Sequence, residues 1–204
     1  MESKFITRSQ HPYCPYIPAN AKKLIVGSIP PYRFCINKPD ELREGDVNFY
    51  YGADDNEFWK LISEVLNVRL DFSNTETAIK QRKDLLDKFN IGITDLVQSC
   101  IHKNQKSSDR DLEILQVKHL RDVLEEHPSI EALLPTSQFV KSLIGKENET
   151  EYRVINKECR EYQISFNGRK YYKVILLYSP SRRVCNPVTV NKRFAQYEKV
   201  FGKQ

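Results

Sequence analysis

The residues Gly27–Pro31, which read Gly-Ser-Ile-Pro-Pro, follow a short apolar run and have the composition of a ligand-binding turn. A glycine lets the backbone approach a ligand closely, and the N–H groups of Ser28 and Ile29 could face a negative charge that develops during a reaction. A rigid turn with no role in binding is the alternative, because glycine and proline are common in loops. The segment therefore indicates either an anion-stabilising turn or a purely structural one.

A second segment, Asn48–Trp59, carries stacking surfaces and an amide directly before an apolar helix. Adjacent side chains of an extended segment point to opposite sides, so Tyr50 or Tyr51 could pack inward while the other stacks on a flat heterocycle. The amide of Asn56 could contact the polar edge of that heterocycle or position a water molecule. Phe58 lies on the apolar face of the helix, where a core position is the alternative.

Two carboxylates, Asp54 and Asp55, stand beside this amide. One of them could cap the helix, with Glu57 completing a capping box if Asp54 is the cap, and Asn56 would then be a first-turn residue. Alternatively, a carboxylate beside Asn56 could activate an attacking water molecule as a general base.

The elements that must position these residues are short apolar runs alternating with segments of helical period, a pattern typical of an α/β sheet. We expect strands at 23–27, 91–96, 130–135 and 172–178, and a hairpin through a type I′ turn at Asn167-Gly168. Helices are expected at five places, listed by the residues that mark them: from Phe58 to Leu66, from Thr77 to Phe89, before His127-Pro128, from near Thr136-Ser137, and from Val190 to Phe201.

Ligands of an open α/β sheet bind beyond the carboxyl ends of its strands. Three loops should therefore converge there, namely Gly27–Pro31, Leu96–Lys103 and Ser179–Arg183. The second contains Ser99 and His102, and this histidine could donate to a leaving base or be a packing residue. The third is basic and continues to Lys192, so it could bind phosphates or be a solvated loop.

Composition sets the limits for these sites. The 204 residues fit one domain of ordinary globular composition, with 40% hydrophobic and 29% charged residues and a net charge of +5. This charge permits a nucleic-acid partner. Five scattered cysteines, with no apolar signal segment, indicate reduced thiols and a cytoplasmic protein, nucleoid-associated if bacterial. No motif predicts a metal or another cofactor.

Four motifs in order resemble the uracil-DNA glycosylase superfamily, and most closely its hypoxanthine-type (deoxyinosine) members. Those enzymes show Gly-Ser-Met-Pro-Gly, Tyr-Tyr-Ala-His-Pro-Arg-Asn-x-Phe-Trp, Gly-Ile-x-x-x-Asp-Val-x-x-Ser-Cys and a late Ser-Pro. This sequence has Gly27–Pro31, Tyr50–Trp59, Gly92–Cys100 and Ser179–Ser181. Mismatch-specific relatives have a catalytic Asn where Ile29 stands. Hypoxanthine-type enzymes also lack it, and the residue thought to replace it maps onto Asn56.

The resemblance implies a three-layer α/β/α sandwich around a short, mainly parallel sheet, formed by residues 1–204 as a single domain. It implies a monofunctional, monomeric DNA glycosylase that hydrolyses the N-glycosidic bond of uracil or hypoxanthine without a cofactor. An alternative is a non-catalytic member that binds nucleic acid or a nucleobase. The candidate site residues are, as catalytic groups, Asn56, Ser28, Ile29, Asp54 and Asp55; as base-binding groups, Gly27, Pro30, Tyr50, Tyr51, Phe58, Ser99 and His102; and as DNA-binding groups, Ser179, Pro180, Ser181, Arg182, Arg183 and Lys192.

Overall fold

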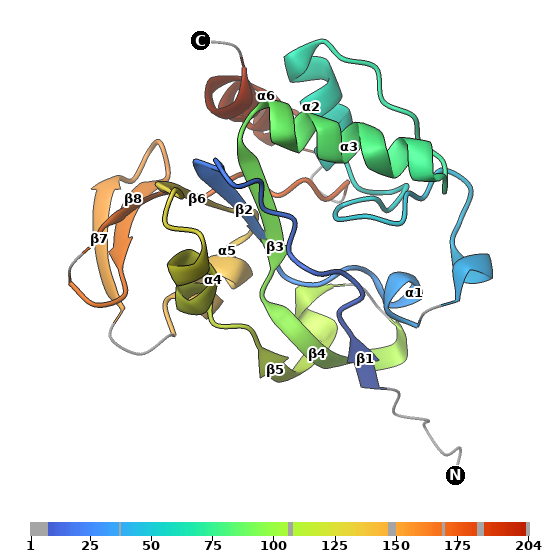
Figure 1. Ribbon diagram of the computed structural model, residues 1–204, viewed down its shortest axis with the longest axis horizontal. Coiled ribbons are helices and arrows are strands. Elements are labelled where there is room, and N and C mark those ends of the chain that lie inside the picture. Colours follow the sequence, from blue (N-terminus) through green and yellow to red (C-terminus); the bar gives the residue numbers. More distant parts are fainter. Residues whose placement is uncertain are drawn as a thin grey trace.

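The computed structural model describes residues 8–36, 38–105, 108–146, 150–168, 170–182 and 186–202, and its central element is a six-stranded mixed sheet (Figure 1). The strand order is β3-β2-β6-β9-β8-β7; the first four strands pair in parallel and the last two antiparallel. The strands are β2 (Lys23–Gly27), β3 (Ile91–Asp95), β6 (Ala132–Pro135), β7 (Glu151–Asn156), β8 (Glu161–Ser165) and β9 (Tyr172–Ile175). The predicted α/β fold with a mainly parallel sheet is confirmed at this level.

Buried side chains on the two faces of this sheet belong to separate cores. Along β2, Leu24 and Val26 join a core that includes α4 and α5, whereas Ile25 joins one that includes α2, α3 and α6. This division follows from the alternation of side chains along a strand. The described residues contain six α-helices: α1 (Tyr32–Cys35), α2 (Phe58–Leu66), α3 (Glu76–Lys88), α4 (Leu120–Glu126), α5 (Gln138–Ile144) and α6 (Pro187–Phe201).

Side-chain caps determine where three of these helices begin. The hydroxyl oxygens of Thr75 and Ser137 accept the N–H groups of Ala78 and Val140 at the starts of α3 and α5. Asn186 caps α6 in the same way, ahead of Pro187 at the first helical position, where the missing N–H costs nothing. The five predicted helices agree with α2 to α6 to within a few residues, whereas α1 was not predicted.

The segment Leu96–Lys103 is not a loop, contrary to the prediction. It contains β4 (Val97–His102), the central strand of a second, antiparallel sheet with β1 (Arg8–Gln10) and β5 (Leu112–Val117). This strand buries polar side chains that have partners far along the chain; for example, Ser9 Oγ lies 3.0 Å from His102 Nδ1. Local polarity made the segment look like a loop, and the long-range contacts make it a strand.

The predicted two-residue turn at Asn167-Gly168 is also wrong. The pairing of β8 with β9 ends at Ile164 opposite Tyr172, so the connection is longer than a type I′ turn allows. Gly168 has φ +71°, a left-handed conformation that suits glycine, but it lies within this longer loop. Strand β7, at the edge of the sheet, was not predicted.

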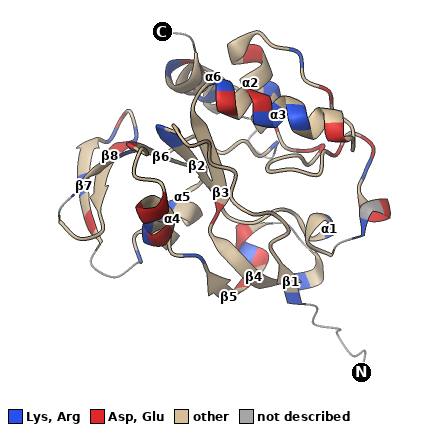
Figure 2. Cartoon of the chain, in the orientation of Figure 1, with Lys and Arg blue, Asp and Glu red and all other residues tan. Residues whose placement is uncertain are grey.

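Charges of both signs alternate along the surface helices. Lys and Arg are interleaved with Asp and Glu along α3 (Figure 2), so the surplus positive charge is not gathered on this helix. Among the described residues, no helix is long and apolar enough to cross a membrane.

Candidate active site

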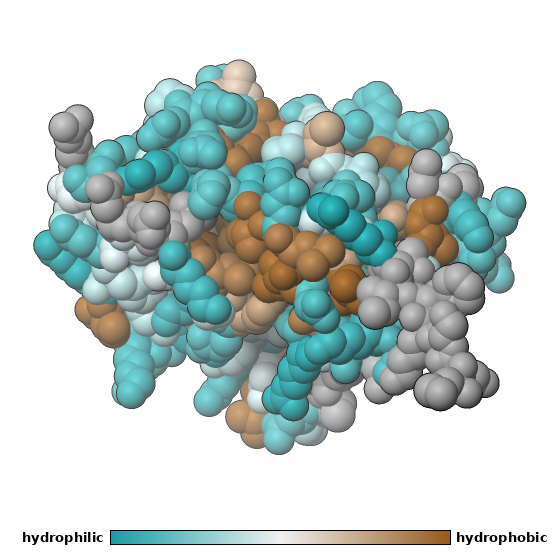
Figure 3. Space-filling view, turned by 90° about the horizontal axis from the view of Figure 1, so that it is seen from below, coloured by the Kyte–Doolittle hydropathy of each residue, from teal (hydrophilic) through white to brown (hydrophobic). Residues whose placement is uncertain are grey.

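A cavity of about 650 Å³ lies beyond the carboxyl ends of β2 and β3, where Gly27 pairs with Asp95. Viewed from below, the side toward which β3 descends in Figure 1, the surface has a hydrophobic area bordered mainly by hydrophilic residues (Figure 3). The cavity has the size and mixed lining of a small-molecule site. Ten of the predicted site residues line it: Ser28, Ile29, Pro30, Tyr51, Asp55, Asn56, Ser179, Pro180, Ser181 and Arg182.

The other predicted site residues lie elsewhere. Tyr50 and Phe58 are fully buried in the α2–α3–α6 core, and Lys192 is exposed on α6. Ser99 and His102 are buried in β4, where Ser99 accepts a hydrogen bond from Arg8 (3.2 Å). Two more, Gly27 and Asp54, lie beside the cavity without lining it, and Arg183 falls outside the described residues.

Gly27 has no room for a side chain. A Cβ atom built on it would lie 2.1 Å from Asp95 Oδ1 and 2.4 Å from the hydroxyl oxygen of Tyr51. The carboxylate and the phenol therefore both press against the Gly27 backbone. The packing of this corner of the cavity requires glycine at this position, because any Cβ would displace both groups.

Tyr51 bridges the cavity wall and the core. Its ring stacks on Phe58, with centroids 4.6 Å apart and planes 29° from parallel, and its hydroxyl lies 2.9 Å from Thr136 Oγ1. Its φ of +55° is uncommon for a bulky residue, and such strained backbone tends to occur at functional sites. Burial raises the pKa of its phenol well above the ordinary value, so it is a neutral hydrogen-bonding group.

Asn56, and neither aspartate, supplies the acceptor at the start of α2. Its Oδ1 accepts the N–H of Phe58 (2.9 Å), whereas Glu57, the formal N-cap, makes no side-chain capping bond. The predicted cap by Asp54 or Asp55 is therefore wrong. Since the oxygen of the amide is fixed by the helix, its NH₂ group is the end left to act on a ligand, and it has no partner among the described residues.

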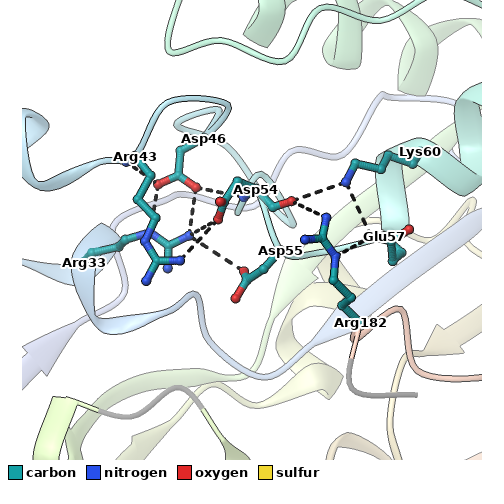
Figure 4. Close-up of polar contacts among 8 residues, drawn as sticks. All are labelled: Arg33, Arg43, Asp46, Asp54, Asp55, Glu57, Lys60 and Arg182. Atoms are coloured by element: carbon teal, nitrogen blue, oxygen red, sulfur yellow. Dashed lines mark hydrogen bonds and ion pairs between the residues drawn. The ribbon is translucent and has the colours of Figure 1, made fainter. Parts of the chain in front are cut away.

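Asp54 belongs instead to an ion-pair network around Arg33 of α1 (Figure 4). Arg33 binds the buried Asp46 through two bonds of 2.8 Å and reaches Asp54 at 3.0 Å and Asp55 at 3.8 Å. Burial opposes ionisation of Asp46, but Arg33 and the backbone N–H groups of Arg43 and Asp54 lower its pKa. The network fixes the segment that precedes Asn56.

A second ion pair joins this segment to the loop after β9 (Figure 4). Arg182 Nε lies 3.0 Å from Glu57 Oε1, and its Nη2 donates to the carbonyl oxygen of Asp54 (3.1 Å). Glu57 N–H also donates to the carbonyl oxygen of Pro180 (2.9 Å). These contacts bring together two motifs that lie more than a hundred residues apart in the sequence.

The sequence reasoning missed two carboxylates that line the cavity. Asp95 ends β3, and its Oδ2 lies 3.0 Å from His11 Nε2. Asp109, in a 3-10 helix at Asp109–Asp111, accepts a hydrogen bond from Ser28 Oγ (2.9 Å). The position of Asp95 at a strand end was the available signal, whereas no local pattern marked His11 or Asp109.

Possible metal ligands are not clustered in the part of the chain described here: no group of three or more His, Cys, Asp or Glu side chains is placed to hold an ion. Cys14, Cys35, Cys100 and Cys159 are free thiols.

The arrangement of the strands and helices is shared with a protein of known structure. The structure is similar to the solution NMR structure of a putative uracil DNA glycosylase from Methanosarcina acetivorans, with a TM-score of 0.60, over 96% of this chain and 97% of that one. The two sequences are 16% identical, so the likeness shows the fold alone. No protein-family profile matches the sequence, and no curated protein does.

Proposed function

We propose that this chain is a monofunctional, monomeric DNA glycosylase that hydrolyses the N-glycosidic bond of a deaminated base, uracil or hypoxanthine. In this proposal, residues 1–204 form one three-layer domain that acts on DNA in the cytoplasm and needs no cofactor. The observation that carries it is the convergence of the Gly27–Pro31, Tyr51–Asn56 and Ser179–Arg182 segments on one cavity of about 650 Å³. These are three of the four motifs on which the resemblance rests.

An extruded base would enter this cavity. Enzymes that act on a base in DNA flip it out of the stack and hold it by stacking and by hydrogen bonds to its polar edge. Tyr51 lines the cavity and offers a ring backed by Phe58, which supports a stacking role. The NH₂ group of Asn56 would donate to a carbonyl oxygen of the base or to the attacking water molecule.

Cleavage of an N-glycosidic bond passes through an oxocarbenium-like state, by analogy with other glycosyl hydrolysis. The base leaves as an anion, which the N–H groups of Ser28 and Ile29 would stabilise. The carbonyl oxygens of Gly27 and Ser28 accept the N–H groups of Leu96 and Val97, at 3.1 and 3.0 Å, so the turn is anchored where β3 passes into β4. The described cavity lining includes no lysine that could form a Schiff base, which supports base release without strand cleavage.

The test is a panel of duplexes that carry uracil, hypoxanthine, xanthine or a thymine mismatch, assayed for abasic sites. We expect abasic product from the uracil or the hypoxanthine duplex, and loss of that product in Tyr51→Ala and Asn56→Ala variants. If the protein made product and both variants kept full activity, the site assignment would be wrong.

A second candidate function is binding without catalysis, either of nucleic acid or of a free nucleobase. It is favoured by Ile29, whose apolar side chain lines the cavity without offering a group for water activation. Tight binding to the duplexes with no abasic product from any of them would support this function and reject the glycosylase.

A further inference from the structure

Three carboxylates line the cavity, from Asp55, Asp95 and Asp109, and their surroundings differ. Asp55 has a side chain that is 55% exposed, and it lies 3.8 Å from Arg33. The Asp95 side chain is 7% exposed, and its Oδ2 is paired with His11. Asp109 is half-buried and forms no ion pair with a Lys or Arg of the described residues. It is therefore the carboxylate least neutralised by a cation.

Asp109 is held by hydroxyl groups from two strand-end loops. Ser28 Oγ, after β2, donates to its Oδ1 (2.9 Å), and Ser137 Oγ, after β6, lies 3.5 Å from its Oδ2. Ser137 is in turn fixed because it caps α5: its Oγ accepts the N–H of Val140. A hydroxyl donor orients a carboxylate but leaves its negative charge in place, whereas a positively charged partner would neutralise that charge. The carboxylate is thus positioned beside Ser28, in the turn proposed to stabilise the leaving base.

We propose that Asp109 is a catalytic residue that accepts the proton of the attacking water molecule. This inference rests on the proposed glycosylase function. The water oxygen forms a bond to C1′ of the sugar while its proton moves to a carboxylate oxygen of Asp109. The electron pair of the C1′–N bond leaves with the base, which then takes up a proton from solvent. Asp109 finally returns its proton to solvent, and the products are a free base and an abasic sugar with a hydroxyl group at C1′.

The electrostatics of the cavity favour this role. Burial raises the pKa of Asp109, and the negative charge of Asp95 adds to the effect, while the hydrogen bonds from Ser28 and Ser137 oppose it. A carboxylate with a raised pKa is a stronger base, and general-base catalysis improves as the pKa approaches the working pH. The charged or titratable groups of the same cavity are Tyr51, Asp55, Asp95, Arg110 and Arg182.

The decisive comparison is between Asp109→Asn and Asp111→Asn. Asn at 109 keeps an acceptor for Ser28 and cannot take a proton, whereas Asp111 belongs to the same 3-10 helix but does not line the cavity. We expect Asp109→Asn to slow single-turnover base release by about 100-fold or more, which is the usual contribution of general-base catalysis. Asp111→Asn, with the same change of charge, should keep the rate.

Two further measurements separate catalysis from folding. The Asp109→Asn variant should bind a duplex with a tetrahydrofuran abasic analogue as tightly as the unaltered protein. The rate of the unaltered protein should rise with pH through a pKa above the ordinary Asp value of about 4, and this rise should vanish in the variant. Equal rates for the Asp109→Asn variant and the unaltered protein would overturn the role of Asp109 and leave the glycosylase function intact. No abasic product from the unaltered protein would overturn both, and a slow variant that had also lost binding would make Asp109 structural.

Discussion

His11 and Asp95, 84 residues apart in the sequence, form a nearly buried pair in which Nε2 lies 3.0 Å from Oδ2 and each side chain is 7% exposed. The pair joins the N-terminal segment to the carboxyl end of β3, where Asp95 lines the cavity. It also keeps the Asp95 carboxylate beside Gly27, where its other oxygen, Oδ1, occupies the space of a missing Cβ atom.

The His11→Ala variant should lower the free energy of unfolding by about 1.5–3 kcal/mol, because it leaves a buried carboxylate without its partner. Urea denaturation measures the change. His119→Ala, at an exposed histidine before α4, is the control and should have little effect. Equal stability of the two variants would show that the His11–Asp95 contact contributes nothing.

The Gly27→Ala variant should lower the free energy of unfolding by about 1–3 kcal/mol, the usual cost of overpacking. Its methyl group would lie within 2.4 Å of both Asp95 and Tyr51, so both of these groups must move. Gly145→Ala is a matched control, since the nearest atom to its added methyl is 3.6 Å away and its φ of −70° suits alanine. The control should be neutral or more stable by about 0.4–1 kcal/mol. Indistinguishable stabilities would contradict the close packing.

Two variants of Asn56 separate its structural and chemical roles. Asn56→Ala removes the acceptor for Phe58 N–H and should cost about 1 kcal/mol of stability, whereas Asn56→Asp keeps a capping oxygen and should not. Both variants lose the NH₂ group, so both should lose base release in a single-turnover assay. Full activity of the Asn56→Asp variant would show that the amide nitrogen has no role in the reaction.

Asp46 should make the stability of the protein depend on pH in the acid range. The pKa of this buried carboxyl is lowered in the folded protein, so its contribution is complete above the unfolded pKa of about 4 and is lost as the pH falls through the folded value. The free energy of unfolding should therefore decrease below about pH 4. Asp46→Asn should be less stable at neutral pH and lose less on acidification. Asp122→Asn, at an exposed residue of α4, is the charge-matched control, and its free energy of unfolding should vary with pH as in the unaltered protein. If the Asp46→Asn variant showed that same pH dependence, this role of Asp46 would be refuted.

Arg182 should contribute about one unit to the slope of log affinity for DNA against log salt concentration, if it contacts a phosphate. The Arg182→Ala variant tests this, with Arg153→Ala on β7, outside the cavity lining, as the control. Because Glu57 holds the Arg182 guanidinium at 3.0 Å, Glu57→Gln should strengthen DNA binding at low salt. If the salt slope were the same in the Arg182→Ala variant, Arg182 would pair with Glu57 without contacting a DNA phosphate.

The sequence by itself determined the elements whose signals are local. The run Lys23–Gly27 has the same bounds in the structure as in the prediction, and α2 begins at Phe58, where the apolar face begins. Strand and helix periods, capping residues and prolines act within a few residues, so a single sequence is enough to place them. The loops Gly27–Pro31 and Ser179–Arg183 were assigned to one site by the rule for parallel strands, and residues 28–31 and 179–182 line the cavity.

Only the tertiary structure decided which side chains meet. Asp54 or Asp55 was expected to cap α2, but Asn56 supplies the acceptor there, and Asp54 pairs with Arg33, whose position depends on the packing of α1. Likewise, β4 is a strand because β1 and β5 pair with it from both sides. Asp109 reaches the cavity, and His11 reaches Asp95, from segments with no recognisable motif. Such contacts join residues that are tens of positions apart, and the free energy that selects them comes from burial and pairing across the whole fold, which no local pattern encodes.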